Sequence, residues 1–332
     1  MKRVALALFV AIGVISTTAF AADLVVKAPP SPPTPSPWDV AITGALMSDY
    51  NFRGITQSNH QPSTQFGVEP RYNFNKDWQG YVGASGESIE FPNRASAEID
   101  IYGGIRPTFD KLALDFGVWY YLYPKGQCFG PAVGLASCDA LGGGNFAAAM
   151  LPNGNTIKGN LSFTEFYGKF VYAVNDDFNF GGSIWGAPNL GVNGAGAGVL
   201  NSGAPGIYYT GNVTLTAPST LFPYGIGAYV SGDVGYWELG TTDAFYGTVA
   251  LPSYWNWDAG LAFTWKIFTL DLRYYQTNLT KAQCNIFTSD QTATFGGAAA
   301  IGAANPTGNV SNWCGADFVA KLSIATTIGA FK

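Results

Sequence analysis

The chain contains one histidine, and the residues around it limit the chemistry it could perform. His60 lies beside Ser58, Asn59 and Gln61, so a serine–histidine hydrolase pair is the arrangement to consider. A loop histidine among polar residues is more often solvated than catalytic, and we predict that the protein is not an enzyme. One histidine excludes a two-histidine zinc motif, and the sequence has no Gly-Lys-Ser/Thr phosphate loop. A serine with glycine at both flanking i±2 positions is also missing. We therefore expect no catalytic residues, no metal and no cofactor.

Four cysteines are the other reactive residues of the sequence: Cys128, Cys138, Cys284 and Cys314. Their spacing lacks the two-residue separation typical of zinc sites. On an oxidising route, four cysteines favour disulfides. Of the three connectivities, we favour the local pairs Cys128–Cys138 and Cys284–Cys314.

Charged residues are the third group with possible chemistry. In segments where side chains alternate between two faces, the charged residues lie on the same face. In residues 65–74, Glu69 and Arg71 stand opposite Phe66 and Val68. Charges inside a membrane-spanning segment are tolerated where they pair or meet water. We therefore predict that this parity lines a water-filled interior, in which acidic side chains outnumber basic ones. The predicted pore-lining residues are Asp49, Arg53, Glu69, Arg71, Glu98, Asp100, Arg106, Asp115, Glu165, Lys169, Asp258, Asp271 and Arg273.

The elements that position these residues are strands, because hydrophobic and polar residues alternate with a period of two. The segments are longer than the ~5–6 residues of an average soluble strand and close to the ~9–11 that cross a bilayer. We predict twelve strands, at about 38–52, 64–74, 78–91, 97–109, 112–124, 161–174, 178–190, 207–217, 222–237, 253–266, 268–280 and 316–331.

The predicted connections alternate between short and long, as in outer-membrane barrels. Tight turns are expected at 75–77, 110–111, 175–177, 218–221 and 267, and long loops at 125–160, 191–206, 238–252 and 281–315. The fold class is therefore all-β, a transmembrane antiparallel β-barrel with short periplasmic turns and long extracellular loops. An even strand number places both termini in the periplasm.

Composition agrees with a protein that meets lipid. Among 332 residues, 12% are charged and 15% are aromatic, whereas globular domains average about 25% charged residues. The formal net charge of −5 and the pI of about 4.8 argue against nucleic-acid binding. We expect the aromatic residues mainly on the lipid face, with Trp255 and Trp257 in one interfacial girdle and Trp265 in the other.

The first residues predict export. Lys2 and Arg3 precede an apolar run, and Ala19-Phe20-Ala21 follows it, so residues 1–21 are a predicted signal peptide. Residues 22–37 are rich in proline and form a predicted extended periplasmic spacer. Residues 38–332 are the predicted barrel.

Three stretches carry a family resemblance. They are 48–57 (SDYNFRGITQ), 97–104 (AEIDIYGG) and 114–124 (LDFGVWYYLYP). Together they resemble the TorF-type porin family, which carries the Gcw_chp domain, most closely over residues 40–125. The resemblance implies a Gram-negative outer-membrane barrel that acts as a diffusion channel. The final Lys332 after Phe331 departs from the aromatic end common in such barrels.

The function that these features predict is porin-like diffusion of small hydrophilic solutes with a mild cation preference. The expected partners are outer-membrane lipid, the barrel assembly machinery and the solutes. Two alternatives remain open. The inward charges could form salt-bridge ladders, with Glu69–Arg71 and Asp271–Arg273 as members, that fill a closed structural barrel. The loops could instead bind a surface partner.

Overall fold

The structure is a computed structural model that describes residues 37–130, 145–148, 151, 153–192, 196–302 and 304–331. The predicted signal peptide, and the predicted spacer up to residue 36, lie outside the described residues.

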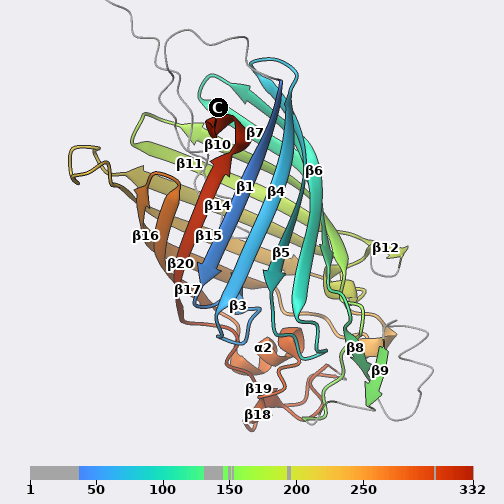
Figure 1. The fold of residues 1–332 in the computed structure, drawn as a ribbon. Coiled ribbons are helices and arrows are strands. Elements are labelled where there is room, and N and C mark those ends of the chain that lie inside the picture. Colours follow the sequence, from blue (N-terminus) through green and yellow to red (C-terminus); the bar gives the residue numbers. More distant parts are fainter. Residues whose placement is uncertain are drawn as a thin grey trace, which may run out of the picture.

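Twelve long antiparallel strands close into a barrel, as the sequence predicts (Figure 1). Strand β1 begins the wall and pairs with both β4 and the last strand, β20, so the sheet has no free edge. The wall strands are β1 (Trp38–Met47), β4 (Ser63–Asn73), β5 (Trp78–Ser88), β6 (Ala97–Phe109), β7 (Leu112–Leu122), β10 (Phe163–Ala173), β11 (Phe178–Ala187), β14 (Gly206–Thr216), β15 (Gly227–Leu239), β16 (Tyr254–Trp265), β17 (Phe268–Thr277) and β20 (Asp317–Thr327).

Period-two alternation gives the wall two different faces. Along β4, Phe66 and Val68 are exposed on the outside, whereas Gln65 and Glu69 are buried inside. A barrel whose outer side chains are apolar suits lipid, where closure also satisfies every backbone group of the wall. No helix among the described residues has the length and hydropathy to cross a membrane.

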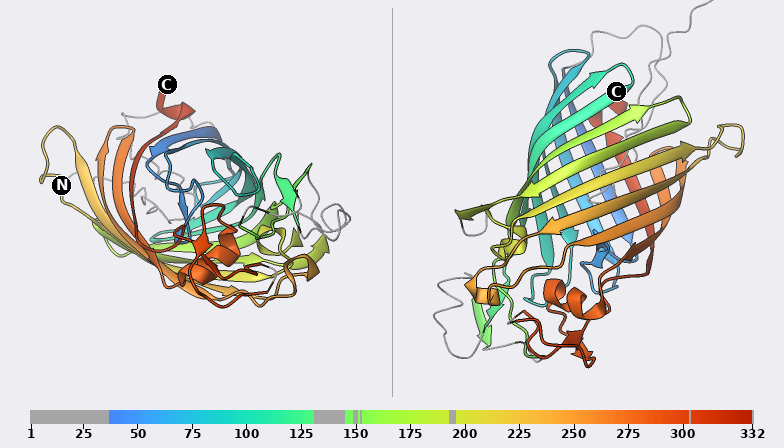
Figure 2. Two further views of the ribbon diagram at one scale, coloured as in Figure 1. Left: turned by 90° about the horizontal axis from the view of Figure 1, so that it is seen from below. Right: turned by 180° about the vertical axis from the view of Figure 1, so that it is seen from behind.

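Short turns gather at one end of the barrel and long loops at the other (Figure 2). The chain begins and ends its wall strands at the short-turn end. One predicted turn is wrong in length: the β14–β15 connection spans 217–226 rather than 218–221. Pro218 and Pro223 lie in this connection, and proline cannot donate a ladder hydrogen bond, which delays the start of β15. The last strand also ends before residue 331, because residues Ile328–Phe331 form a 3-10 turn, η4.

Smaller elements build the long-loop end. The paired short strands are β2 (Asn51–Phe52) with β3 (Ile55–Thr56), β8 (Gln127–Phe129) with β9 (Asn145–Ala148), β12 (Asn189–Val192) with β13 (Gly196–Ala197), and β18 (Thr294–Phe295) with β19 (Asn309–Val310). The short helices are η2 (Val199–Asn201), η3 (Ala244–Tyr246) and α2 (Lys281–Thr288). These loops contact one another: the buried Lys158 ammonium binds both Asp243 and the carbonyl oxygen of Asn201. The long loops therefore form a packed cap.

Candidate functional site: a hairpin inside the barrel

The first long connection folds back into the barrel as the β2–β3 hairpin. Its two-residue turn is Arg53-Gly54, with φ of 52° and 81°, and positive φ at both positions is what a type I′ turn requires. Asn51 accepts a hydrogen bond from the Gly54 amide at 3.0 Å. A Cβ at Gly54 would lie 3.0 Å from Thr277 and 3.1 Å from Asn256. Glycine is thus needed both for the turn and for close approach to the wall.

Arg53 ties the hairpin to the barrel wall through a buried ion pair. Its Nη1 and Nη2 donate to the two carboxylate oxygens of Glu165 on β10, at 2.8 and 2.7 Å. Both side chains are fully buried. Tyr121 on β7 donates a further hydrogen bond to Glu165, and Tyr254 on β16 donates to the Arg53 carbonyl oxygen. The bidentate geometry fixes the orientation of the guanidinium as well as its position.

The contacts of the hairpin place it across the lumen. Arg53 also lies over the rings of Tyr208 on β14 and Trp237 on β15, with distances from the guanidinium carbon to the ring centroids of 4.1 and 4.3 Å. Together with Glu165, Tyr121, Tyr254 and Thr277, these contacts come from the inner faces of six wall strands. A segment that touches β7, β10, β14, β15, β16 and β17 at once must lie inside the barrel.

A layer of aromatic side chains surrounds the hairpin. Trp119 stacks on Tyr102 with ring centroids 4.0 Å apart, and Tyr121 stacks on Phe163 at 4.5 Å. The expectation that aromatic residues lie mainly on the lipid face is therefore too narrow. The largest buried side chains among the described residues include Trp119, Trp185, Tyr121, Tyr208 and Tyr254. A twelve-strand lumen is wider than that of a filled eight-strand barrel, and here large side chains and the inserted hairpin occupy part of it.

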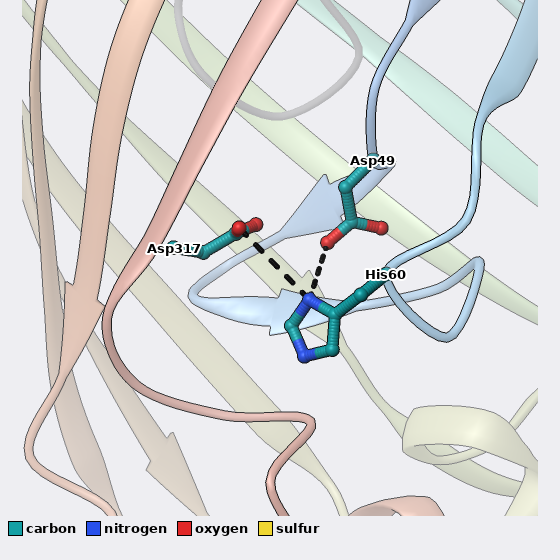
Figure 3. Close-up of side chains that lie close together, drawn as sticks. All are labelled: Asp49, His60 and Asp317. Atoms are coloured by element: carbon teal, nitrogen blue, oxygen red, sulfur yellow. Dashed lines mark hydrogen bonds and ion pairs between the residues drawn. The ribbon is translucent and has the colours of Figure 1, made fainter.

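Asp49 precedes the hairpin in the chain and contacts residues that follow it, including His60 (Figure 3). Its carboxylate accepts hydrogen bonds from the hydroxyl groups of Thr56 and Ser58. It also accepts one from Nδ1 of His60, at 3.0 Å. His60 Nδ1 also lies 3.9 Å from Asp317. Burial alone would raise the pKa of Asp49, but its hydrogen bonds, led by that from His60, bring it below the usual value.

The contact with Asp49 also changes the pKa of His60. The hydrogen bond to Asp49 is the largest influence and raises the pKa of His60 to about 9, against an opposing effect of partial burial. His60 Nε2 lies 3.0 Å from the carbonyl oxygen of Asn312. Two acceptors on one imidazole favour the doubly protonated ring. A cation with both nitrogens engaged cannot serve as a general base, so this geometry gives no support to a hydrolase.

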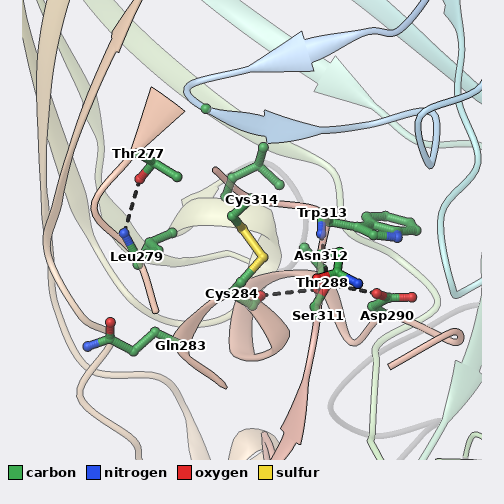
Figure 4. The surroundings of a disulfide bond; sticks show 12 residues. Thr277, Leu279, Gln283, Cys284, Thr288, Asp290, Ser311, Asn312, Trp313 and Cys314 are labelled. Carbon is green, nitrogen blue, oxygen red and sulfur yellow. Dashed lines mark hydrogen bonds between the residues drawn. A yellow bond between two sulfur atoms is a disulfide. The ribbon is translucent and has the colours of Figure 1, made fainter. Parts of the chain in front are cut away.

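The cap holds the hairpin from the other side. Ile55 forms a bridge with Cys314, and the Thr56 amide donates to the Trp313 carbonyl oxygen at 2.9 Å. Cys314 is disulfide-bonded to Cys284 on α2, which confirms that predicted pair (Figure 4). A capping box at Thr280 and Gln283 begins α2. The helix, the disulfide and the hairpin therefore form one connected unit.

The other predicted disulfide involves Cys128, which is buried and disulfide-bonded. Its predicted partner, Cys138, lies outside the described residues. None of the described cysteines is a free thiol.

Two of the predicted pore-lining residues reach the interior in an unexpected way. Strand β1 ends at Met47 rather than at residue 52, so Asp49 and Arg53 belong to the inserted connection and not to the wall. The alternation pattern could not reveal this, because two-residue strands are too short to show a period.

The remaining predicted pore-lining residues are on wall strands and gather into clusters. Glu69 accepts hydrogen bonds from Arg71 and Arg106, and Arg106 also donates to Asp115. Arg273 binds both Asp258 and Asp271. The predicted pairs Glu69–Arg71 and Asp271–Arg273 are therefore present. Lys169 lies over the rings of Tyr167 and Trp185.

A third cluster holds carboxylates only. Oxygens of Glu87, Glu98 and Asp100 lie within 4.8 Å of one another, and all three residues are buried. Their hydrogen-bond donors include Gln65 for Glu87, Tyr50 for Glu98 and Ser85 for Asp100, all uncharged. The cluster makes this part of the interior rich in carboxyl groups.

The predicted girdle residues are on the outer face. Trp255, Trp257 and Trp265 are 48%, 41% and 44% exposed. Trp255 and Trp257 are near the long-loop end of β16, and Trp265 is its last residue at the short-turn end.

Solved structures with a similar arrangement include several outer-membrane proteins. The NanC porin in a rhombohedral crystal form is 8% identical with a TM-score of 0.41, covering 86% of this chain and 98% of its own. The COG4313 outer membrane channel from Pseudomonas putida F1 is 8% identical with a TM-score of 0.41, covering 92% and 100%. LpxR from Salmonella typhimurium is 8% identical with a TM-score of 0.39, covering 86% and 99%. A comparison with curated proteins finds no match.

The family comparison concerns the part of the chain that contains the hairpin. Residues 32–136 match the family Gcw_chp, described as a bacterial protein of unknown function. This region includes β1, the hairpin, and β4 to β7. The predicted resemblance is thus confirmed over residues 32–136, and the protein is a closed twelve-strand β-barrel whose N-terminal part matches the Gcw_chp family model.

Proposed function

We propose that this protein is a channel of the Gram-negative outer membrane for small hydrophilic solutes, and that the β2–β3 hairpin holds it closed. The observation that carries the proposal is the buried Arg53–Glu165 pair, which joins a segment inside the lumen to the wall. In this proposal the periplasm lies at the short-turn end, where the N-terminal spacer would emerge.

The chemistry of the contact supports a movable plug. A buried ion pair is often no more stabilising than apolar side chains of the same volume, whereas losing one partner is costly. Apolar side chains would therefore fill the lumen permanently just as well. A charged pair adds a contact with two defined states, one in which the partners are paired and one in which each is hydrated. β2 and β3 pair with each other and with no wall strand. The hairpin can thus leave without breaking a hydrogen bond of the barrel ladder.

A mild cation preference is the second part of the proposal. Acidic side chains outnumber basic ones among the predicted pore-lining residues, and the carboxyls of Glu87, Glu98 and Asp100 would ionise once an open pore hydrates them. Rings of carboxylates favour cations in pores. In a KCl gradient, the reversal potential should be shifted from zero toward the equilibrium potential of potassium. A shift toward the equilibrium potential of chloride would refute the cation preference.

A permanently closed structural barrel is the second candidate. The stacked aromatic layer around Trp119 and Tyr121 favours it, because these rings already fill much of one cross-section. Conductance separates the two functions, since a structural barrel passes no current whatever happens to the hairpin.

The decisive experiment compares purified wild-type protein with a variant that lacks residues 51–56, in planar bilayers. We expect rare openings for the wild type and sustained current for the deletion. Deleting residues 218–223, an equally long exposed segment at the short-turn end, is the matched control and should behave as the wild type does. No current from any of the three proteins would refute the channel. Equal, large currents from all three would refute the plug.

A further inference from the structure

Three side chains that can ligate a metal converge beside the hairpin: Asp49, His60 and Asp317 (Figure 3). One ligand atom of each lies within 4.8 Å of the other two. His60 Nδ1 is 3.0 Å from Asp49 Oδ2 and 3.9 Å from Asp317 Oδ1. Around a tetrahedral zinc ion, whose bonds to nitrogen and oxygen measure about 2.0–2.2 Å, neighbouring ligand atoms lie roughly 3.3 Å apart. Shifts of less than about 1 Å would therefore place all three around one ion.

Both carboxylates are oriented by hydrogen bonds from behind, as ligands of metal sites usually are. Asp49 uses Oδ1 to accept hydrogen bonds from Thr56 and Ser58, so that Oδ2 faces the imidazole. Asp317 uses Oδ2 to accept a hydrogen bond from Asn51 at 3.4 Å, and its Oδ1 is the oxygen nearer to the imidazole. Each carboxylate thus presents one oxygen to the same point.

A backbone carbonyl selects the imidazole nitrogen that would bind the metal. His60 Nε2 lies 3.0 Å from the carbonyl oxygen of Asn312, and a carbonyl can only accept, so Nε2 carries a proton. Histidines that bind metals commonly donate their other ring N–H to such an acceptor. A bare lone pair on Nδ1 would repel the two carboxylate oxygens. A cation is needed between them, either the proton that the raised pKa of His60 reflects or a metal ion.

We infer that Asp49, His60 and Asp317 bind one Zn²⁺ ion, which takes the place of the Nδ1 proton. An imidazole among the ligands suits zinc better than Ca²⁺ or Mg²⁺, which favour oxygen ligands. The His60 side chain is 38% exposed, so the ion can enter from the long-loop side and water can complete four ligands.

The ion would connect two distant parts of the chain. Asp49 and His60 flank the hairpin, whereas Asp317 begins β20, so zinc would tie the first connection to the wall. The expectation of no metal rested on local motifs, and these ligands meet only because β20 pairs with β1 when the barrel closes. The inference goes beyond the proposed channel, because a barrel that never conducts would still bind zinc.

Isothermal titration calorimetry tests the site directly. Zinc chloride is titrated into the full-length protein in detergent, after treatment with EDTA and without an affinity tag. His60 is the only histidine of the sequence, so no other imidazole competes. We expect one equivalent of zinc to bind per chain, and excess Mg²⁺ or Ca²⁺ not to displace it. The absence of saturable zinc binding, or displacement by either of these ions, would overturn the zinc site.

The proton balance gives a signature of the proposed ligand. Each zinc ion bound would release the Nδ1 proton to solvent, and Asp49 and Asp317 are the titratable groups that face this nitrogen. Because the pKa of His60 is about 9, the ring is protonated in the metal-free protein at neutral pH. Zinc affinity should therefore rise at least about tenfold between pH 6.5 and about pH 7.5. An affinity that does not change with pH would show that zinc binds elsewhere.

Two variants remove the ligands one at a time. His60→Gln and Asp317→Asn should each weaken zinc binding at least ~100-fold, since losing only the partner behind a ligand typically costs about 10–100-fold. Glu87→Gln in the carboxylate cluster and Asp176→Asn in an exposed turn are the controls and should bind zinc as the wild type does. Folding of each variant is checked by its heat-modifiable mobility on gels. Unchanged binding in either folded ligand variant, or lost binding in folded Glu87→Gln, would overturn the proposal whether or not the barrel conducts.

Discussion

Neutralising Glu165 is the sharpest test of the hairpin as a plug. In Glu165→Gln the side chain keeps its shape but loses the charge that faces Arg53, whose two hydrogen bonds measure 2.8 and 2.7 Å. Both groups are fully buried, and removing one partner of a buried ion pair costs about 3–5 kcal/mol. Glutamine retains one acceptor oxygen, so we expect about 3 kcal/mol. Because ~1.4 kcal/mol is a factor of ten, the open state should gain about 100-fold relative to the closed state.

Single-channel recording measures this ratio as the open probability of each variant. Glu238→Gln makes the same chemical change at an exposed position on β15, and we expect no effect there. Asp271→Asn breaks another buried pair, with Arg273, away from the hairpin. It should lower stability against denaturant without raising open probability. If Asp271→Asn opens the channel as much as Glu165→Gln does, general loosening of the barrel explains the openings and the plug is wrong.

Three further predictions concern the hairpin and the cap that holds it. Asp49 raises the pKa of His60 from 6.5 to about 9, so the contact is fully stabilising below pH 6.5 and its stabilisation is lost as the pH rises through 9. The open probability of the wild type should therefore rise between pH 6.5 and 10. The same rise in a His60→Gln variant would contradict this prediction. Gly54→Ala places a side chain at φ 81° and 3.0 Å from the wall, which should cost about 1–2 kcal/mol from backbone strain alone and raise open probability, whereas Gly211→Ala, with nothing within 4 Å, should not. Cys314→Ser removes a crosslink across 30 residues, typically worth about 2–4 kcal/mol; limited proteolysis should cleave between residues 278 and 316 faster in this variant, and an unchanged rate would count against a stabilising role.

The barrel itself could be predicted from the sequence with good accuracy. Alternation such as Phe66 and Val68 against Gln65 and Glu69 recurs in strands long enough to cross a bilayer, and it reveals both the strands and the side that each residue faces. The local disulfide Cys284–Cys314 followed from the same count, because both cysteines fall in one long loop. Errors remained at strand ends, as at Met47, where a turn competes with the strand.

The candidate site was harder to predict because its contacts join distant parts of the chain. Arg53 and Glu165 were both assigned to the interior, but their pairing depends on a hairpin that enters the lumen. Tyr208, Trp237 and Tyr254 have the inward parity. Parity does not say that Tyr208 and Trp237 meet the Arg53 guanidinium, or that Tyr254 donates to the Arg53 carbonyl oxygen. The motif at residues 48–57 indicated the family without indicating where that segment would fold.

What the sequence determined by itself is the wall: a twelve-strand transmembrane barrel with an apolar outer face and a charged inner one. These properties are local and repeat every two residues, so each segment carries its own information. What the tertiary structure decided is the content of the lumen. Whether inward charges meet water or one another depends on closure of the sheet, which brings β10 and β14 to β17 around a single hairpin. That arrangement is set by barrel geometry and packing, and no local pattern encodes it.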